Sequence, residues 1–231
     1  MTALAAPPPE KTEAAPPAAV PGSPTTALVI TDMVLPEMLV LHARPNRPVS
    51  EEEYFAFCRD NDHLRVECTA DGEWIIMPPT AGDTSDRNAE LTMQLRIWAK
   101  RDGSGVAFDS NGGFTLPNGA SRAPDASWVL RSRLATLTPE EKQKFLPLCP
   151  DFAAELRSRS DTLRDVQAKM DEYLACGARL GLLIDPSSRA VHVYRPGQPA
   201  PTTLNDPETV PCDPELPGFV LDARALFDTS F

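Results

Sequence analysis

The sequence predicts an α/β fold, because segments with strand periodicity and segments with helix periodicity follow one another along the chain. The short segment at residues 64–68 alternates polar and apolar side chains, which is the period of a β-strand, and residues 73–77 follow as its hairpin partner. The segment 85–100 repeats apolar residues at helical spacing. The segment 180–184 is short and wholly apolar, as in a strand that is buried on both faces. A length of 231 residues suits one domain with an appendage.

The N-terminal segment differs in composition from the rest of the chain. Residues 1–25 are rich in Pro and Ala and have almost no large apolar side chains. Such a segment cannot bury enough surface to offset the entropy lost on ordering, so a disordered tail is predicted. Residues 26–48 are interrupted by prolines, and we expect an extended lead-in that lays a short apolar strip on the domain.

The sequence shows no signal for membrane insertion or secretion. It has no run of eighteen apolar residues, and its N-terminus lacks the cationic stretch of a signal peptide. The five cysteines are scattered and odd in number, which favours reduced thiols over disulfides. A cytoplasmic protein without a membrane partner is therefore expected.

The domain is expected to span residues 49–195, and its elements have local signals. Ser50 and the three Glu residues after it indicate a helix start, with a hydroxyl cap and acidic groups at the positive end of the helix dipole. Asp71-Gly72 predicts a hairpin turn between the first two strands, and Gly103 and Gly105 close the long helix. The remaining predicted elements are strands at Asp125–Leu130, Phe152–Leu156, Leu180–Ile184 and Val191–Tyr194, a short helix within 131–148, a helix from Ser160 or Asp161 to Cys176, and a Pro-rich C-terminal extension at 196–231 that packs on the domain through Phe219–Phe227.

Two of the predicted strands carry acidic residues at positions that face away from the core. In the first, Asp125 and Ser127 alternate with apolar residues. In the second, Glu155 and Arg157 alternate with Phe152, Ala154 and Leu156, which form its core face. If the strands are neighbours, two carboxylates and one guanidinium converge. Carboxylates from separate strands suit Mg²⁺ or Mn²⁺, which can activate water and neutralise charge on a phosphate.

The order and spacing of several motifs resemble the restriction endonucleases of the Uma-two family, a branch of the PD-(D/E)XK nuclease superfamily. The similar segments cover about residues 49–195 and are Asp71-Gly72-Glu73, Met77-Pro78-Pro79, Arg122–Val129, Pro150–Ser158, the helix with Lys169, Tyr173 and Gly177, and Leu182–Pro186. The resemblance implies a restriction-endonuclease-like core, a mixed sheet flanked by helices. It also implies Asp125 and Glu155 as ligands of Mg²⁺ or Mn²⁺, and DNA as the substrate.

The chain departs from the superfamily pattern at two positions. The pattern has Glu-x-Lys on the second strand, but this chain has Arg157, and arginine cannot lose a proton to act as a base. The resemblance implies that Lys169 on the next helix takes the lysine's place and orients or deprotonates the attacking water, while Arg157 binds the scissile phosphate. The second departure is Asn88, where relatives commonly have a histidine, which weakens a functional assignment there.

Each candidate residue also has an ordinary structural explanation. Asp125 follows a proline at a strand entry, where Asp is common in turns. Lys169 can pair with Asp165, four residues earlier on the same helix, and Arg157 can belong to a charged surface. Glu155 is flanked by apolar residues, and in such a setting a functional carboxylate is favoured over one on a solvated face.

The charge of the protein limits the functions that fit it. A net charge of −11 disfavours a protein that coats nucleic acid, because that role needs a broad basic surface. The leading prediction is therefore a metal-dependent DNA endonuclease with a local site, which a homodimer would suit if both DNA strands are cut. The alternatives are a nuclease-like fold that has lost catalysis and serves as a binding or assembly module, and a metal-dependent hydrolase of a smaller phosphoester.

Overall fold

The computed structural model describes residues 39–42, 49–77 and 79–228. The predicted disordered tail at 1–25 lies outside the described residues, as does most of the predicted lead-in at 26–48. Within that lead-in, Leu39–His42 forms strand β1. Over the part of the chain that is described, no helix combines the length and apolar character needed to cross a membrane.

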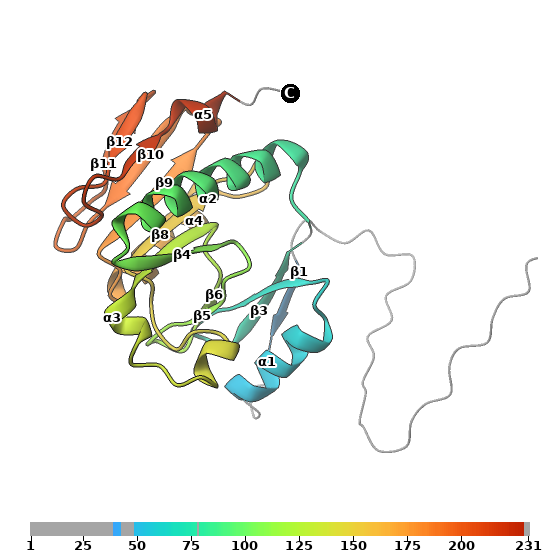
Figure 1. Ribbon diagram of the computed structural model, residues 1–231. Helices are drawn as coiled ribbons and strands as arrows, with labels where there is room; N and C mark the ends of the chain where they lie inside the picture. The colour runs from blue at the N-terminus through green and yellow to red at the C-terminus, as the bar shows by residue number, and fades with distance from the viewer. Residues whose placement is uncertain (1–38, 43–48, 78, 229–231) are drawn as a thin grey trace, which may run out of the picture. The chain divides into compact units, whose positions relative to one another are not determined.

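A six-stranded mixed sheet forms the centre of the fold (Figure 1). Its strands, in spatial order, are β11 (Thr202–Asn205), β10 (Ala190–Tyr194), β9 (Leu180–Asp185), β8 (Phe152–Leu156), β7 (Ala126–Leu130) and β4 (Gly105–Asp109). Only β8 and β9 run parallel, and every other neighbouring pair is antiparallel. The central strands are buried on both faces, which explains the continuous apolar sequence of β9.

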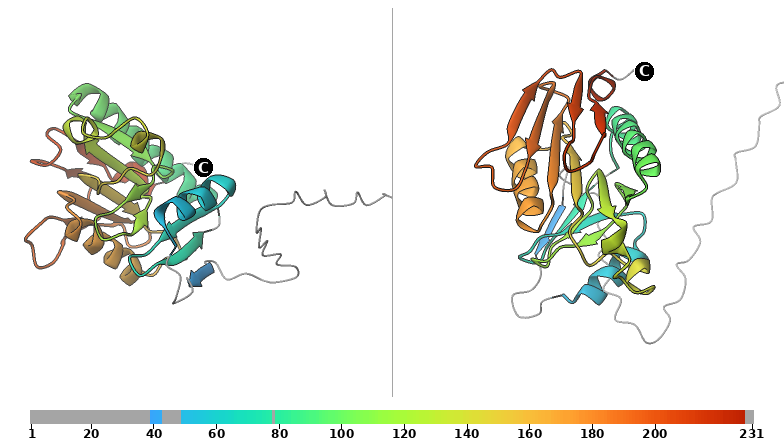
Figure 2. Two further views of the ribbon diagram at one scale, coloured as in Figure 1. Left: turned by 90° about the horizontal axis from the view of Figure 1, so that it is seen from below. Right: turned by 60° about the vertical axis from the view of Figure 1, so that its left-hand side comes forward.

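Two long helices cover opposite faces of this sheet (Figure 2). Helix α2 (Gly82–Asp102) packs on β4 and β7, and its Leu91, Leu95 and Trp98 lie in one hydrophobic core. Helix α4 (Leu163–Ala175) packs on β8, β9 and β10, and its Met170 and Tyr173 lie in a second core. The predicted α/β architecture, a mixed sheet flanked by helices, is confirmed.

A second, smaller sheet is built mainly from the first part of the described chain. Its strands, in spatial order, are β1, β3 (Glu73–Met77), β2 (Arg65–Cys68), β6 (Ser121–Arg122) and β5 (Phe114–Thr115). Strands β2 and β3 form the predicted hairpin, and β6 joins β2 through the pair Cys68 and Ser121. Helix α1 (Glu51–Asp60) comes before this hairpin in the chain, and it starts as predicted. The Ser50 hydroxyl accepts a hydrogen bond from Glu53 N–H, and the Glu53 carboxylate accepts one from Ser50 N–H.

The segment between β7 and β8 differs from the prediction of one capped helix within 131–148. It contains the four-residue helix α3 (Arg131–Leu134) and a single 3-10 turn at Glu141–Gln143. Thr138 and Glu141 do exchange the hydrogen bonds of a helix start. The turn stops because Phe145 and the residues after it leave the helical path, and Leu146 pairs with Phe114 of β5.

The C-terminal segment after β11 contributes a large part of the first core. It forms a two-stranded sheet of β12 (Thr209–Pro211) and β13 (Val220–Asp222), followed by helix α5 (Arg224–Phe227). Helix α2 contacts both β13 and α5. Leu216, Phe219 and Leu226 are almost fully buried in the same core as Trp98.

Candidate metal and catalytic site

The two acidic residues singled out by the sequence are held next to each other by the pairing of β7 and β8. Ala126 pairs with Ala154, and continuing this register places Asp125 opposite Glu155. The N–H of Leu156 donates to Asp125 Oδ2 at 2.8 Å, which fixes the Asp125 carboxylate against β8. Both side chains are buried, with 6% of Asp125 and 5% of Glu155 exposed. Because alternate residues of both strands fill the core on the other face, the two carboxylates share a face as predicted.

Helix α4 brings two polar side chains to Glu155. Lys169 Nζ lies 3.0 Å from Glu155 Oε1, and the Tyr173 hydroxyl donates to the same oxygen at 2.8 Å. The two residues are four positions apart and therefore lie on one face of the helix. Lys169 does not form the predicted structural alternative of an ion pair with Asp165, which instead bonds Thr162 at the helix start. The structure therefore brings Lys169 into contact with Glu155.

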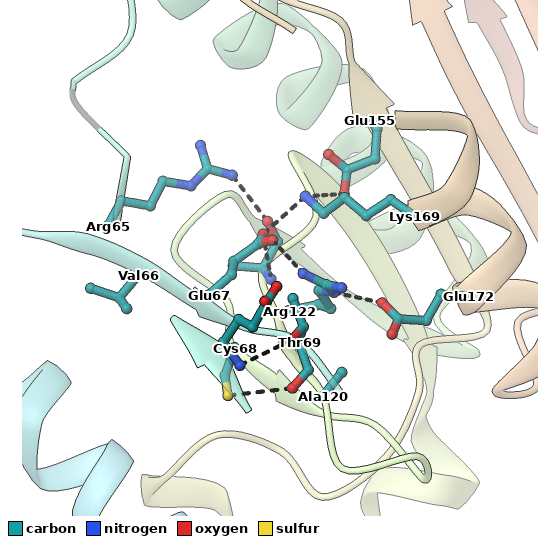
Figure 3. Close-up of polar contacts among 12 residues, drawn as sticks. Arg65, Val66, Glu67, Cys68, Thr69, Ala120, Arg122, Glu155, Lys169 and Glu172 are labelled. Atoms are coloured by element: carbon teal, nitrogen blue, oxygen red, sulfur yellow. Dashed lines mark hydrogen bonds and ion pairs between the residues drawn. The ribbon is translucent and has the colours of Figure 1, made fainter. Parts of the chain in front are cut away.

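Glu67 on β2 is a further acidic residue of the site, and it was not among the predicted candidates. It is 2% exposed, and its Oε1 lies 2.9 Å from Lys169 Nζ (Figure 3). Its Oε2 lies 3.2 Å from Arg122 Nη1, and Arg122 also bonds Glu172 of α4 at 2.6 Å. The alternation of residues 64–68 puts Arg65 and Glu67 on one face. What the sequence does not show is that this face meets α4.

Asp125 Oδ1 is approached by two donors from outside its own sheet. Arg65 Nη2 on β2 lies 3.4 Å away, and this guanidinium also donates to the carbonyl oxygen of Ala123 at 3.0 Å. Asn88 Nδ2 on α2 donates to the same carboxylate oxygen at 3.3 Å. Both contacts are long for hydrogen bonds that involve a carboxylate, so Asp125 Oδ1 is held only weakly.

Arg157 lies after the end of β8 and contacts a different carboxylate. Its Nη1 donates to Asp185 Oδ2 at 2.7 Å, and its Nε donates to the carbonyl oxygen of Asp161. Asp185 is the last residue of the parallel neighbour β9, which explains why the pair forms. Among the described residues, Arg157 forms no hydrogen bond or ion pair with Asp125 or Glu155. Its predicted role in binding phosphate stays a prediction.

The burial of these charges changes their proton affinities. Burial raises the pKa of Glu155 to about 7, and this effect outweighs the opposing influence of Lys169. Burial alone would lower the pKa of Lys169, but the carboxylates of Glu155 and Glu67 outweigh it, so its pKa is raised. Burial likewise opposes ionisation of Glu67, yet Lys169 and Arg122 keep its pKa below the ordinary value. Lys169 is therefore a buried ammonium group held between two carboxylates.

The residues around Asp125 and Glu155 fit a hard divalent cation. The ligands that Mg²⁺ and Mn²⁺ prefer are oxygens, and here two carboxylates from adjacent strands meet. The buried amide oxygen of Asn88 lies beside Asp125 and has no hydrogen-bond partner among the described residues. Within the described part of the chain, no group of three or more His, Cys, Asp or Glu side chains could hold a metal. An ion at this site would thus need other oxygens, from amides, water or phosphate.

Two comparisons with known proteins find similarities, and both are to nucleases. A family model, Uma2, described as "Putative restriction endonuclease", matches residues 51–224. A crystal structure from Anabaena variabilis ATCC 29413, described as "a putative nuclease belonging to DUF820", has a TM-score of 0.60 and 25% sequence identity, and the match covers 70% of this chain and 89% of that chain. No curated protein matches. Both descriptions name a nuclease, and the family match includes Glu67, Asp125, Glu155 and Lys169. Because that match spans well over half of the sequence, the chain belongs to the Uma2 family of restriction-endonuclease-like proteins.

Proposed function

We propose that the protein is a metal-dependent DNA endonuclease that hydrolyses phosphodiester bonds. The observation that carries the proposal is the meeting of Asp125 and Glu155 on adjacent strands, with Lys169 in contact with Glu155. The family description and that of the structural relative support nuclease chemistry. Asp125 and Glu155 hold a Mg²⁺ or Mn²⁺ ion, which supplies charge neutralisation and a more acidic bound water.

Lys169 orients the attacking water through its ammonium group. Its pKa is raised by Glu155 and Glu67, so the group remains protonated and does not accept a proton from water. A fixed ammonium can donate hydrogen bonds to the nucleophile and stabilise negative charge as it develops. Glu67 and Glu155 hold Lys169 in place from two sides, at 2.9 and 3.0 Å.

The surroundings of Asp125 offer positive charge to a phosphate. A cavity of about 460 Å³ is lined by Asn88 and by two cations, Arg65 and Arg96, together with the hydroxyls of Ser85 and Thr80 and one carboxylate, Asp109. Guanidinium and hydroxyl groups are common phosphate ligands. Arg157 Nη2 forms no hydrogen bond within the described residues, so Arg157 can bind a phosphate oxygen while Nη1 stays on Asp185. Local cationic groups of this kind let a protein of net charge −11 bind a DNA backbone.

A plasmid-nicking assay tests the proposal. Supercoiled DNA is incubated with Mn²⁺ and the wild-type protein, Asp125→Ala, or the control Asp86→Ala, which changes an exposed residue of α2. We expect the wild type and the control to nick the DNA. In Asp125→Ala the nicking rate should fall by at least about 100-fold, because removing a group that stabilises transition-state charge has an effect on this scale. Equal nicking by all three proteins, or none by the wild type over a range of DNA substrates, would refute the proposal.

A second candidate is a nuclease-like fold that has lost catalysis and acts as a binding or assembly module. The observation that favours it is Arg157 at the position of the superfamily lysine, paired with Asp185. Titration calorimetry with Mn²⁺ separates the two candidates. A degenerate site gives no measurable binding, whereas a live site binds Mn²⁺ and loses that binding in Glu155→Ala. A homodimer, which would suit cleavage of both DNA strands, stays a prediction in either case.

A further inference from the structure

Asn88 contacts the proposed metal ligand Asp125, but only one end of its amide group has a partner. Nδ2 donates to Asp125 Oδ1 at 3.3 Å. Oδ1 is buried and forms no hydrogen bond with any described residue. A buried carbonyl oxygen without a partner destabilises a protein, so native structures rarely leave one. Oδ1 is therefore not committed to any described residue and is available to a group that is not part of the chain.

The distance between Asn88 and Asp125 is that of two ligands on one octahedral ion. Rotating the amide by half a turn places Oδ1 where Nδ2 now lies, 3.3 Å from Asp125 Oδ1. Two acceptor oxygens at this separation repel each other unless a cation lies between them. In an octahedron with metal–oxygen bonds of about 2.1 Å, neighbouring oxygens are about 3 Å apart. The rotation gives up one long hydrogen bond of Nδ2 and breaks none of Oδ1.

The rest of the donor set explains why an amide oxygen is needed. Asp125 Oδ2 is already taken by the N–H of Leu156, so Asp125 offers an ion only Oδ1. Glu155 Oε1 is taken by Lys169 and Tyr173, so Glu155 offers mainly Oε2. No third His, Cys, Asp or Glu completes a metal site within the described ranges. The oxygen-rich coordination of Mg²⁺ and Mn²⁺ commonly includes Asn carbonyl groups alongside carboxylates.

We propose that the amide oxygen of Asn88 is a third protein ligand of the divalent cation, beside Asp125 and Glu155. The inference rests on the proposed metal-dependent function. In the free protein, Asn88 Nδ2 faces the Asp125 carboxylate, and on binding the ion the amide turns so that Oδ1 faces the metal. Asn88 thus switches from donor to ligand without a change of the backbone.

Mn²⁺ affinity measured by titration calorimetry tests this ligand assignment without recourse to activity. We expect Asn88→Ala to weaken Mn²⁺ binding by about 10-fold or more, the scale for losing a group that supports a metal site. Asn88→Asp should bind Mn²⁺ more tightly than the wild type, because a second negative oxygen replaces a neutral one. The control Asn111→Ala, which removes an exposed amide from a turn, should bind as the wild type does.

The outcomes separate this inference from the proposed function. If the wild type binds Mn²⁺ and Asp125→Ala does not, but Asn88→Ala binds normally, the ligand assignment is wrong and the metal-dependent function stands. If Asn88→Ala binds weakly but Asn88→Asp binds no more tightly than the wild type, direct ligation is also wrong. No binding by the wild type overturns the function and the inference together. Thermal unfolding in EDTA shows whether each variant folds. If Asn88→Ala does not fold, the Mn²⁺ affinity of Asn88→Asp decides whether Asn88 is a ligand.

Discussion

Lys169 determines whether the acidic residues of the site can be buried together. Its ammonium group contacts Glu67 from the small sheet and Glu155 from the large one, and all three side chains are largely shielded from water. Without that group, two carboxylates would lie buried near each other, and Glu67 would keep Arg122 as its ion-pair partner and the N–H of Ala123 as a hydrogen-bond donor. Removing one partner of a buried ion pair is far more destabilising than replacing the whole pair with neutral groups.

We therefore predict that Lys169→Met lowers the free energy of unfolding of the metal-free protein by about 3–5 kcal/mol. Once a buried carboxyl group has lost its cation, burial raises its pKa above the pKa that it has in the unfolded chain. Stability is then retained at low pH and lost as the pH rises through that folded pKa, so the deficit should be larger at pH 8 than at pH 5. Urea unfolding in EDTA at both pH values measures this loss of stability.

Two further variants make this prediction specific. The triple variant Lys169→Met, Glu67→Gln, Glu155→Gln should recover most of the lost stability, because no uncompensated charge remains buried. The control Lys142→Met changes an exposed lysine and should behave as the wild type does. An unchanged unfolding midpoint in Lys169→Met would contradict the buried ammonium.

The sequence alone could place some of these residues but not others. The shared face of Asp125 and Glu155 follows from strand alternation, which depends only on neighbours in the chain. Glu67 was missed because its contact with Lys169 joins residues 102 positions apart, one on the small sheet and one on helix α4. Arg157 was expected beside the carboxylates, but its partner Asp185 comes from β9. Only the parallel pairing of β8 and β9 brings these two together, and no local pattern reports it.

At the scale of elements, the segments with strong periodicity were predicted closely. Strand β8 has the expected bounds, Phe152–Leu156, and α2 extends the predicted helix by a few residues at each end. The short strands β5, β6, β11 and β12 were not identified individually, because two to four residues are too few to show a period. Gly105 was interpreted as the end of a helix, but it begins β4 and lies against Trp128 of β7.

The Gly105 contact gives a prediction about the pairing of β4 and β7. A Cβ atom at residue 105 would overlap the indole ring of Trp128, which is itself packed against Trp98 with ring centroids 5.4 Å apart. Because the ring has little space to move, Gly105→Ala should destabilise the protein by about 1–3 kcal/mol, the usual effect of overpacking a core. The measurement is thermal unfolding, with Ser104→Ala as an exposed neighbouring control. A midpoint equal to that of the control would show that the ring can shift freely.

At the scale of the whole molecule, the C-terminal segment was expected to pack on the domain through Phe219–Phe227. The structure places residues of this segment in the same core as α2 and the face of the large sheet beneath it. Trp98 Nε1 donates to the carbonyl oxygen of Pro217, and Asp222 and Gln94 exchange two hydrogen bonds. The sequence could not show this extent of burial, because prolines and short strands in the segment conceal its apolar positions.

Phe219 and Val220 provide a matched test of that packing. Phe219 is 2% exposed and contacts the rings of Trp98 and Phe152, whereas Val220 is 50% exposed. We predict that Phe219→Ala lowers the free energy of unfolding by about 3–5 kcal/mol, as for other buried aromatic residues. Val220→Ala should change it by no more than about 0.5 kcal/mol. Equal effects of the two substitutions in urea unfolding would show that this segment is not part of the core.

The ammonium group of Lys169 also bears on whether the protein needs an ion in order to fold. In small zinc domains the ligands stay apart until the ion arrives, and folding waits for it. Here the chain supplies its own counter-ion for the acidic cluster, together with the Tyr173 hydroxyl on Glu155. Folding can therefore be completed without a divalent ion, and under the proposed metal-dependent function an ion would enter a pocket that is already assembled.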